Sequence, residues 1–328
     1  QPFKTSNMFV VNNYATAVIL CIVTMLCWGS WGNTQKLAGR TWRYELFYWD
    51  YVIGLLLFSV LSAFTLGSFG TEGRSFLADL AQADAGNLFS AFMGGVIFNA
   101  SNILLSAAIA LCGMSVAFPV GVGLALVLGV VINYFSAAKG DPTFIFLGVL
   151  LIAAAIVMNG LTTKGILISV AAGIIMAFFY RFVAASMDLN DFAAPTAGKM
   201  TPYTAVFIFA VGVFISNFLF NTVAMKRPVD GEPVRIADYF KGGLKTHMVG
   251  VLGGMIWCLG ESFSMIASGK AGAAISYGLG QGATLVSALW GILIWKEFKG
   301  APKISHRLNL GMFLLFLTGL GMLIYAGA

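Results

Sequence analysis

Long apolar runs recur along almost the whole chain and are separated by short polar segments. A helix needs about 20 consecutive apolar residues to cross the hydrocarbon core of a bilayer. The pattern therefore predicts ten transmembrane helices. Their expected residues are 13–35, 45–67, 88–110, 114–137, 143–160, 165–187, 202–224, 246–268, 272–295 and 307–327. Connections as short as residues 112–114 and 268–272 predict that consecutive helices are antiparallel neighbours.

Composition supports this fold class, an all-α polytopic membrane protein with ten transmembrane helices. Of the 328 residues, 59% are hydrophobic and 10% are charged, whereas soluble domains carry about 25% charged residues. The apolar run after Asn13 is too long for the core of a signal peptide, so we interpret it as a retained first span. Residues 1–7 precede Met8, and nothing in the pattern requires them to be structural.

The distribution of basic residues predicts the orientation of the chain in the membrane. Lys and Arg gather in the loops that follow the odd-numbered spans, above all in residues 225–245 and 296–307. The positive-inside rule places these loops in the cytoplasm. We therefore expect a multi-pass protein of the cell (plasma or inner) membrane with both termini outside the cytoplasm. We interpret the net charge of +6 as a consequence of the basic loops that orient the chain in the membrane, and not as a sign of a nucleic-acid-binding surface.

The second half of the chain resembles the first at a shift of 159 positions. The matching glycines are Gly94 with Gly253, Gly95 with Gly254, Gly113 with Gly272, Gly121 with Gly280 and Gly123 with Gly282. The shift moves each span by five, an odd number, so the halves have opposite orientations. We expect two inverted five-helix repeats, residues 8–160 and 164–328, in one membrane domain. Inverted repeats are typical of secondary transporters, whose solute binds near the bilayer midplane.

Ionisable residues inside the predicted spans are candidates for function because each costs about 2.5–3.5 kcal/mol to insert. Glu261 and Asp50 are the candidates for proton coupling. Arg181 is a possible partner of either acid across the two halves, or it extends outward to the interface. A static Glu261–Arg181 pair that only holds helices together is the alternative. Glu45, near a span end, is interpreted as interfacial.

Uncharged polar and aromatic residues near the glycine-rich stretches predict where a solute binds. The candidates are Trp28, Trp31, Asn33, Asn99, Asn102, Arg181, Trp257, Tyr277 and Gln281. Asn102 aligns with Glu261 in the repeat, so we expect the two residues to face one central cavity. Amides and carboxylates supply paired donors and acceptors, while aromatic rings suit a small polar ligand. Asn99 has a second interpretation, which is hydrogen bonding between helices.

Few residues of this chain are suited to catalysis or metal binding. The four cysteines lie inside apolar runs, and the two histidines lie near segment ends. This spacing predicts no disulfide framework and no zinc site. We therefore expect neither an enzyme nor a cofactor, and the expected partners are a small polar solute, protons and the lipid bilayer.

Residues 27–51, CWGSWGNTQKLAGRTWRYELFYWDY, resemble a known family. The stretch is similar to the sugar and ureide branch of the drug/metabolite transporter superfamily, which includes glucose/ribose uptake proteins, the L-rhamnose–proton symporter and ureide permeases. The resemblance covers the whole chain and implies ten spans in two inverted repeats, with proton-coupled uptake of a small polar solute. Plant ureide permeases have a long central loop, whereas residues 159–165 form only a short link here. This difference favours a sugar.

The predicted function is therefore proton-coupled import of a monosaccharide by alternating access. Uptake of a ureide or nucleobase-type metabolite is the alternative within the same family. Proton-coupled efflux of drugs or metabolites is a third possibility, and it would favour an acid without a nearby arginine. A membrane sensor would be expected to carry a soluble signalling domain or a long tail.

Overall fold

The computed structural model describes residues 7–39, 42–157, 163–300 and 303–328, and within these ranges it is all-helical apart from isolated β-bridges. The helices are α1 (Tyr14–Ser30), α2 (Gly32–Leu37), α3 (Tyr44–Phe64), α4 (Phe76–Gln82), α5 (Ala85–Cys112), α6 (Met114–Ala117), α7 (Gly123–Ser136), α8 (Pro142–Val157), α9 (Thr163–Ala185), α10 (Pro202–Lys226), α11 (Ile236–Tyr239), α12 (Leu244–Ala271), α13 (Ala273–Gln281), α14 (Ala283–Leu289) and α15 (Lys303–Ala326). Two π-helical turns join them, at Phe118–Val122 and Trp290–Ile294.

Nine helical segments within the described residues are long and apolar enough to cross a membrane. The chain is therefore a polytopic membrane protein. The predicted fifth span corresponds to α8, which is apolar but has only 16 residues. Residue 160, at which the predicted first repeat ends, lies outside the described residues. The short helices α4 and α11 lie in segments that were expected to be loops.

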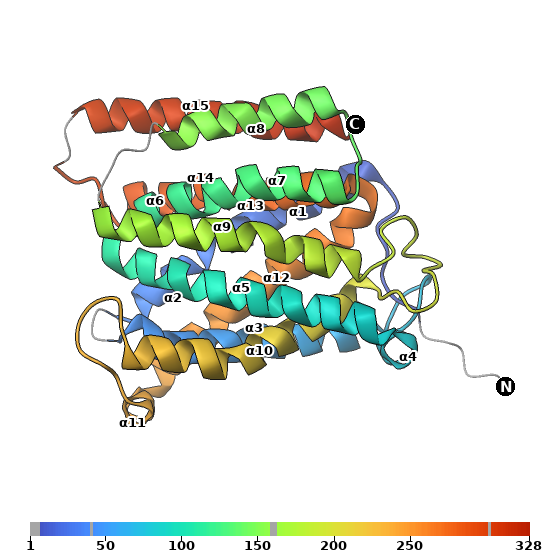
Figure 1. Cartoon of the computed structure of the whole chain (residues 1–328), viewed down its shortest axis with the longest axis horizontal. Coiled ribbons are helices and arrows are strands. Elements are labelled where there is room, and N and C mark those ends of the chain that lie inside the picture. Colours follow the sequence, from blue (N-terminus) through green and yellow to red (C-terminus); the bar gives the residue numbers. More distant parts are fainter. Residues whose placement is uncertain (1–6, 40–41, 158–162, 301–302) are drawn as a thin grey trace.

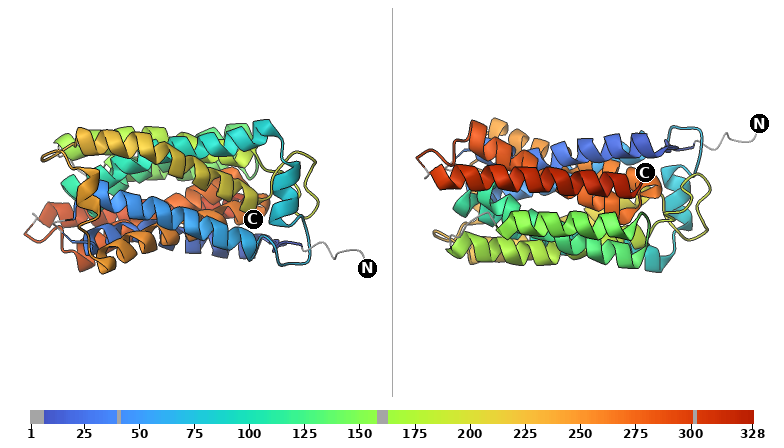
Figure 2. Two further views of the ribbon diagram at one scale, coloured as in Figure 1. Left: turned by 90° about the horizontal axis from the view of Figure 1, so that it is seen from below. Right: turned by 90° about the horizontal axis from the view of Figure 1, so that it is seen from above.

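The long helices lie side by side along the longest axis of the molecule (Figure 1). α8 and α15 pack together on one side, and α3 and α10 lie on the other, with α5, α9, α12 and α1 between them (Figures 1 and 2). The start of α1 and the end of α15 meet, because the Tyr14 hydroxyl donates to the Ile324 carbonyl at 2.6 Å. α11 lies at the opposite end of the bundle.

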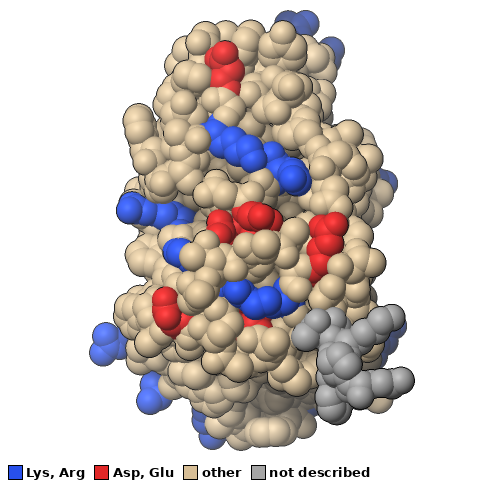
Figure 3. Space-filling view, turned by 90° about the vertical axis from the view of Figure 1, so that its right-hand side faces the viewer, with Lys and Arg blue, Asp and Glu red and all other residues tan. Residues whose placement is uncertain are grey.

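The end at which α1 begins is capped by loops and by the short helix α4 (Figure 1). Acidic and basic side chains alternate on its surface (Figure 3). Arg74 pairs with the buried Asp79 at 2.9 Å and donates to the carbonyls of Pro195 and Lys199. These contacts fasten α4 to the loop that follows α9.

Two helices near the centre, α5 and α12, match each other closely. Both have 28 residues, and each ends at a glycine in the left-handed region, Gly113 with φ +79° and Gly272 with φ +83°. A side chain would be strained there, so glycine allows the chain to turn directly into the next helix. α5 packs against α9 and α10, and α12 packs against α1 and α3.

Glycine also brings the backbones of these helices close together. A Cβ added to Gly95 of α5 would meet the backbone carbonyl of Phe209 in α10. A Cβ added to Gly254 of α12 would meet the carbonyl of Tyr51 in α3. Small residues at such crossings are a general means of packing helices in membranes. The two crossings use glycines that the sequence shift of 159 aligns.

Candidate functional site

A small cavity lies where the broken helices of both halves of the chain meet. Its lining residues are Trp28, Trp31, Phe98, Asn102, Leu105, Phe118, Val122, Met176, Phe179, Trp257, Gln281 and Ala283. The free volume is only ≈ 10 Å³, about enough for one water. The cavity is therefore closed around its own side chains, and these must separate to admit a solute.

The backbone is irregular on two sides of this cavity. The π-helical turn Phe118–Val122 contains Pro119 and contributes two lining residues. α13 ends at Gln281, another lining residue, and Gly282 separates it from α14. Non-helical backbone at membrane depth is tolerated where it is buried in protein or lines a cavity. Interrupted helices of this kind are a feature of solute sites in transporters.

Aromatic rings form the walls of the cavity. Trp257 of α12 is stacked on Trp28 of α1, with ring centroids 5.6 Å apart and planes inclined by 10°. Its other neighbours are Phe209, also stacked at 5.7 Å, and Phe98, at 4.1 Å. These flat apolar faces suit a planar ligand that could slide between the rings.

Two residues that line the cavity carry polar atoms without a hydrogen-bond partner among the described residues, and these atoms indicate which ligand groups would fit. Asn102 is 1% exposed, and its Nδ2 donates to the Tyr48 hydroxyl at 3.2 Å. Its Oδ1 has no hydrogen-bond partner, and neither has Nε1 of Trp28. A buried polar atom without a partner costs about 1–3 kcal/mol. One acceptor and one donor without a partner thus belong to residues that line the cavity.

Glu261 lies one helical turn beyond Trp257 on α12 and is fully buried. Both of its carboxylate oxygens lack a hydrogen-bond partner, and none of the ion pairs among the described residues includes it. Its electrostatic neighbours include three buried tyrosines, Tyr51, Tyr180 and Tyr277. An acid in such surroundings is a functional candidate by default.

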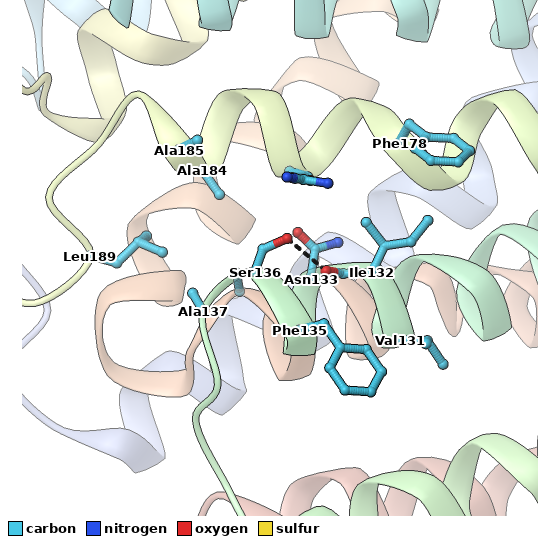
Figure 4. A pocket seen from close by; sticks show the side chains of 12 residues that line it. Val131, Ile132, Asn133, Phe135, Ser136, Ala137, Phe178, Ala184, Ala185 and Leu189 are labelled. Carbon is cyan, nitrogen blue, oxygen red and sulfur yellow. Dashed lines mark hydrogen bonds between the residues drawn. The ribbon is translucent and has the colours of Figure 1, made fainter.

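Of the alternatives for Arg181, the pair with Glu261 is not among the ion pairs of the described residues, and the structure has the arginine extending outward. Tyr180 faces the interior, where its hydroxyl lies 3.0 Å from the Ser264 hydroxyl. The next residue of α9, Arg181, is rotated by about 100° around the helix and is exposed. It lines a separate hollow between α7 and α9, part of which is shown in Figure 4.

Asp50 does not line the cavity either. It is buried in α3, where its carboxylate accepts from the Tyr239 hydroxyl at 2.5 Å and lies 2.9 Å from Nδ1 of His247. Trp42 packs edge-on against His247. Asp50 therefore fastens α11 and the start of α12 to α3. These partners could not be predicted from the sequence pattern, because they lie about 190 residues away along the chain.

Three further candidates bind neighbouring helices rather than the cavity. Asn33 Oδ1 accepts from the Trp295 indole at 2.7 Å. Asn99 Nδ2 donates to the Val213 carbonyl and the Ser216 hydroxyl, as the alternative interpretation of this residue expects. The Tyr277 hydroxyl donates to the Met176 carbonyl at 3.3 Å. Of the nine predicted binding residues, five line the cavity: Trp28, Trp31, Asn102, Trp257 and Gln281.

A wider hollow of ≈ 800 Å³ opens at the end of the bundle that carries α11. Gln35 is one of its lining residues, and it exchanges two hydrogen bonds with Ser106, at 2.7 and 2.9 Å. Leu105, beside Ser106, already lines the central cavity. The Gln35–Ser106 pair therefore lies near both hollows, and we call the wider one the vestibule.

Glu297 joins three segments at the rim of the vestibule. Its carboxylate pairs with Lys36 of α2 and accepts from the backbone N–H groups of Met114 and Ser115, at 3.1 and 2.8 Å. Burial raises the pKa of Glu297, but the hydrogen bonds from Lys36 and Ser115 outweigh it and hold the pKa below its usual value. The start of α6 carries a positive backbone potential that also favours the anion.

Glu297→Gln should destabilise the protein by about 1–3 kcal/mol at neutral pH, because the amide loses charge-assisted hydrogen bonds. The pKa of Glu297 is lower in the folded state, so its stabilisation is present above the ordinary carboxyl pKa and lost as the pH falls through the folded value. Melting curves of both proteins in detergent should converge in acid below the ordinary carboxyl pKa. A gap that keeps its full size well below the ordinary carboxyl pKa, where the folded protein also binds the proton, would contradict this assignment.

The fold and the cavity define a membrane protein that moves a small solute. The ureide permease family model matches residues 47–164 and 153–326, which together cover most of the chain. The chain therefore belongs to the ureide permease family, a family of membrane transporters. The ureide permease part of the predicted resemblance is thereby confirmed.

Relatives in plants match along nearly their whole length. Ureide permease 1 of Arabidopsis thaliana is 23% identical over 383 residues, which cover 96% of this chain and 98% of that protein. Ureide permease 2 of the same plant is 22% identical, with the same coverage. A crystal structure with a TM-score of 0.57 is 15% identical and covers 93% of this chain and 97% of its own. That similarity concerns the fold alone.

The comparisons favour the ureide alternative over the predicted sugar. The alignment to ureide permease 1 is longer than the 328 residues of this chain. The relative therefore carries inserted residues, and their absence here did not prevent the match. The length of a connecting segment, on which the sugar prediction rested, says little about the solute, since connections can change length without altering a cavity.

Proposed function

We propose that the protein is a secondary transporter that takes up a ureide or a chemically related nitrogen-rich metabolite, such as a nucleobase, together with protons. The observation that carries the proposal is the aromatic cavity with one unpartnered acceptor and one unpartnered donor. The family assignment supports it, since the matched plant relatives are named ureide permeases.

The chemistry of the cavity fits a ureide better than a monosaccharide. A ureide presents N–H and C=O groups in one plane. An N–H of the ligand would donate to Asn102 Oδ1, and a carbonyl would accept from Trp28 Nε1, while the ring faces of Trp28 and Trp257 would lie against the plane. A sugar carries many hydroxyls that each need partners, and an aromatic cavity with few polar atoms leaves most of them unsatisfied.

We further propose that the chain forms two inverted five-helix repeats, residues 8–160 and 164–328, in which the short helix α8 is the fifth of ten spans. The equal lengths of α5 and α12, their matching terminal glycines and their matching glycine crossings support this arrangement. Transport would proceed by rocking of one repeat against the other around the cavity. The positive-inside rule applied to the basic loops supports a vestibule on the cytoplasmic side of the cell membrane with both termini outside.

Glu261 is proposed as the proton-carrying residue. An ionised carboxylate without a hydrogen bond or a cation is very costly at membrane depth. We therefore propose that Glu261 is protonated in this closed conformation and releases its proton when an aqueous path reaches it. Its position one turn from Trp257 would let solute binding and proton binding influence each other. Efflux is the second candidate function. It would favour an acid without a nearby arginine, and Glu261 has no ion pair with Arg181 among the described residues.

A thermal-shift screen tests the choice of solute. Purified protein in detergent would be heated with ureides, with nucleobases and with monosaccharides. A ligand present at 100 times its dissociation constant stabilises the native state by about 2.7 kcal/mol. We expect ureides or nucleobases to raise the melting temperature and sugars to leave it unchanged. Stabilisation by a monosaccharide alone would contradict the proposal and restore the sugar prediction.

A further inference from the structure

A second hollow, separate from the central cavity, lies between the ends of α7 and α9 and has a free volume of ≈ 550 Å³. Its walls are mainly apolar. Phe135 and Phe178 line it and are 76% and 42% exposed. Because helices of a membrane protein present such rings to lipid, the hollow opens toward the bilayer and not toward water.

One cation lines this apolar hollow. Arg181 is exposed and takes part in none of the hydrogen bonds or ion pairs found among the described residues. It lies four residues before the end of α9 at Ala185, about 6 Å from that end at 1.5 Å per residue. At this depth a guanidinium reaches the level of the lipid headgroups.

The facing helix supplies a second polar feature. Asn133 of α7 is 1% exposed, and its Nδ2 donates to the Gly129 carbonyl at 2.8 Å. Its Oδ1 has no partner. Figure 4 shows Asn133 and Ser136 pointing from α7 toward α9 across the hollow. The site therefore combines a free cation with a buried amide oxygen, both beside an apolar surface.

The surroundings of the hollow add positive charge. Lys139 follows the lining residue Ala137 by two positions and donates to the Gly269 carbonyl at 2.8 Å. Burial lowers the pKa of Lys139, and the nearby Lys270 lowers it further. Asp188 and Asp141 lie at this end of the bundle and accept hydrogen bonds from Thr196 and from the start of α8. Neither of them lines the hollow, whose lining residues include Arg181 and no carboxylate.

We propose that this hollow binds a membrane phospholipid, with the phosphate on the Arg181 guanidinium and an acyl chain along Phe135 and Phe178. A guanidinium and a phosphate form a strong charge-assisted pair with two parallel hydrogen bonds. The unpartnered Asn133 oxygen would accept from a hydroxyl or amine of the headgroup. The occupant is a lipid rather than a free phosphate ester because the exposed rings supply a surface for its chains.

Native mass spectrometry of the full chain in detergent tests the proposal. Phosphatidylglycerol would be titrated into the wild type, Arg181→Gln, Arg181→Lys and Ala185→Trp, which would fill the hollow without removing a charge. Removal of the guanidinium should weaken binding about fivefold, which corresponds to the ≈ 1 kcal/mol that one basic residue contributes near anionic lipid. Arg181→Lys should recover part of the affinity, and Ala185→Trp should lose it.

The matched control is Arg227→Gln, which removes another exposed arginine, at the end of α10 on the opposite side of the bundle. It should bind phosphatidylglycerol as the wild type does. Diacylglycerol with the same chains should bind more weakly than phosphatidylglycerol. The proposal is overturned by equal binding to wild type and Arg181→Gln, by equal binding of diacylglycerol, or by displacement of the lipid by inorganic phosphate or by a ureide. Displacement by a ureide would identify the hollow as an entry site for the solute instead.

Discussion

Replacing Glu261 by glutamine should uncouple the transporter. The amide has nearly the shape of the protonated acid, so the closed conformation and solute binding should be preserved. It cannot release a proton, so a pH gradient should no longer drive accumulation. In liposomes we expect gradient-driven ureide uptake to fall at least about tenfold, which equals 1.4 kcal/mol of lost driving force. Exchange of labelled for unlabelled solute, which needs no net proton movement, should continue.

Two variants control for this result. Glu297→Gln removes a carboxylate at the vestibule rim that is already paired with Lys36, and it should leave the coupling ratio unchanged. Glu261→Ala should impair exchange as well, since it leaves a gap beside Trp257. Full pH-driven accumulation by Glu261→Gln would show that the proton is carried elsewhere, and Asp50 would be the next candidate.

Replacing Asn102 by alanine should weaken solute affinity more than any other single change to the polar groups of the cavity. The variant removes the acceptor Oδ1 and also leaves the Tyr48 hydroxyl without its donor. Loss of one hydrogen bond that leaves a buried partner unsatisfied costs about 1–3 kcal/mol. The expected increase in the dissociation constant is about 5-fold to 150-fold. Titration of the purified protein by thermal shift measures it.

Asn99 provides the matched control on the same helix. It lies one turn before Asn102, is equally buried, and bonds to α10 rather than to the cavity. Asn99→Ala should lower the melting temperature while the affinity of the folded protein stays near that of the wild type. If both variants bind as the wild type does, the central cavity is not the solute site.

The helical framework could be predicted from the sequence because its signal is strong. Apolar runs of about 20 residues are incompatible with any other backbone structure in lipid. The predicted span 88–110 corresponds to α5, and the predicted span 272–295 corresponds to Ala273–Ile294. The glycine pairs that aligned in the sequence occur at the helix crossings and turns that require glycine, so the reason for their spacing is physical.

The candidate site could be predicted only in part. Trp28, Trp257 and Asn102 were found because aromatic and amide side chains inside apolar spans are unusual. The role of Asp50 could not be predicted, since its partners His247 and Tyr239 lie in a distant segment that appeared to be a loop. The alternatives for Arg181 stayed open for a related reason.

The side chain of Arg181 follows the rotation of α9, which one sequence does not fix. A helix of small and apolar residues such as α9 can bury several different faces, and the buried Tyr180 decides which face is inside. The preference for a sugar over a ureide rested on loop length, which carries little information about binding, and the comparisons favour the ureide alternative.

Solute-dependent proton entry into liposomes containing the wild-type protein tests the central claim most directly. A pH-sensitive dye inside the vesicles would report protons that enter when a ureide is added outside without any imposed gradient. We predict that a ureide or nucleobase acidifies the interior, that a monosaccharide does not, and that Glu261→Gln abolishes the signal. Ureide uptake without acidification, or acidification by a sugar alone, would contradict the account.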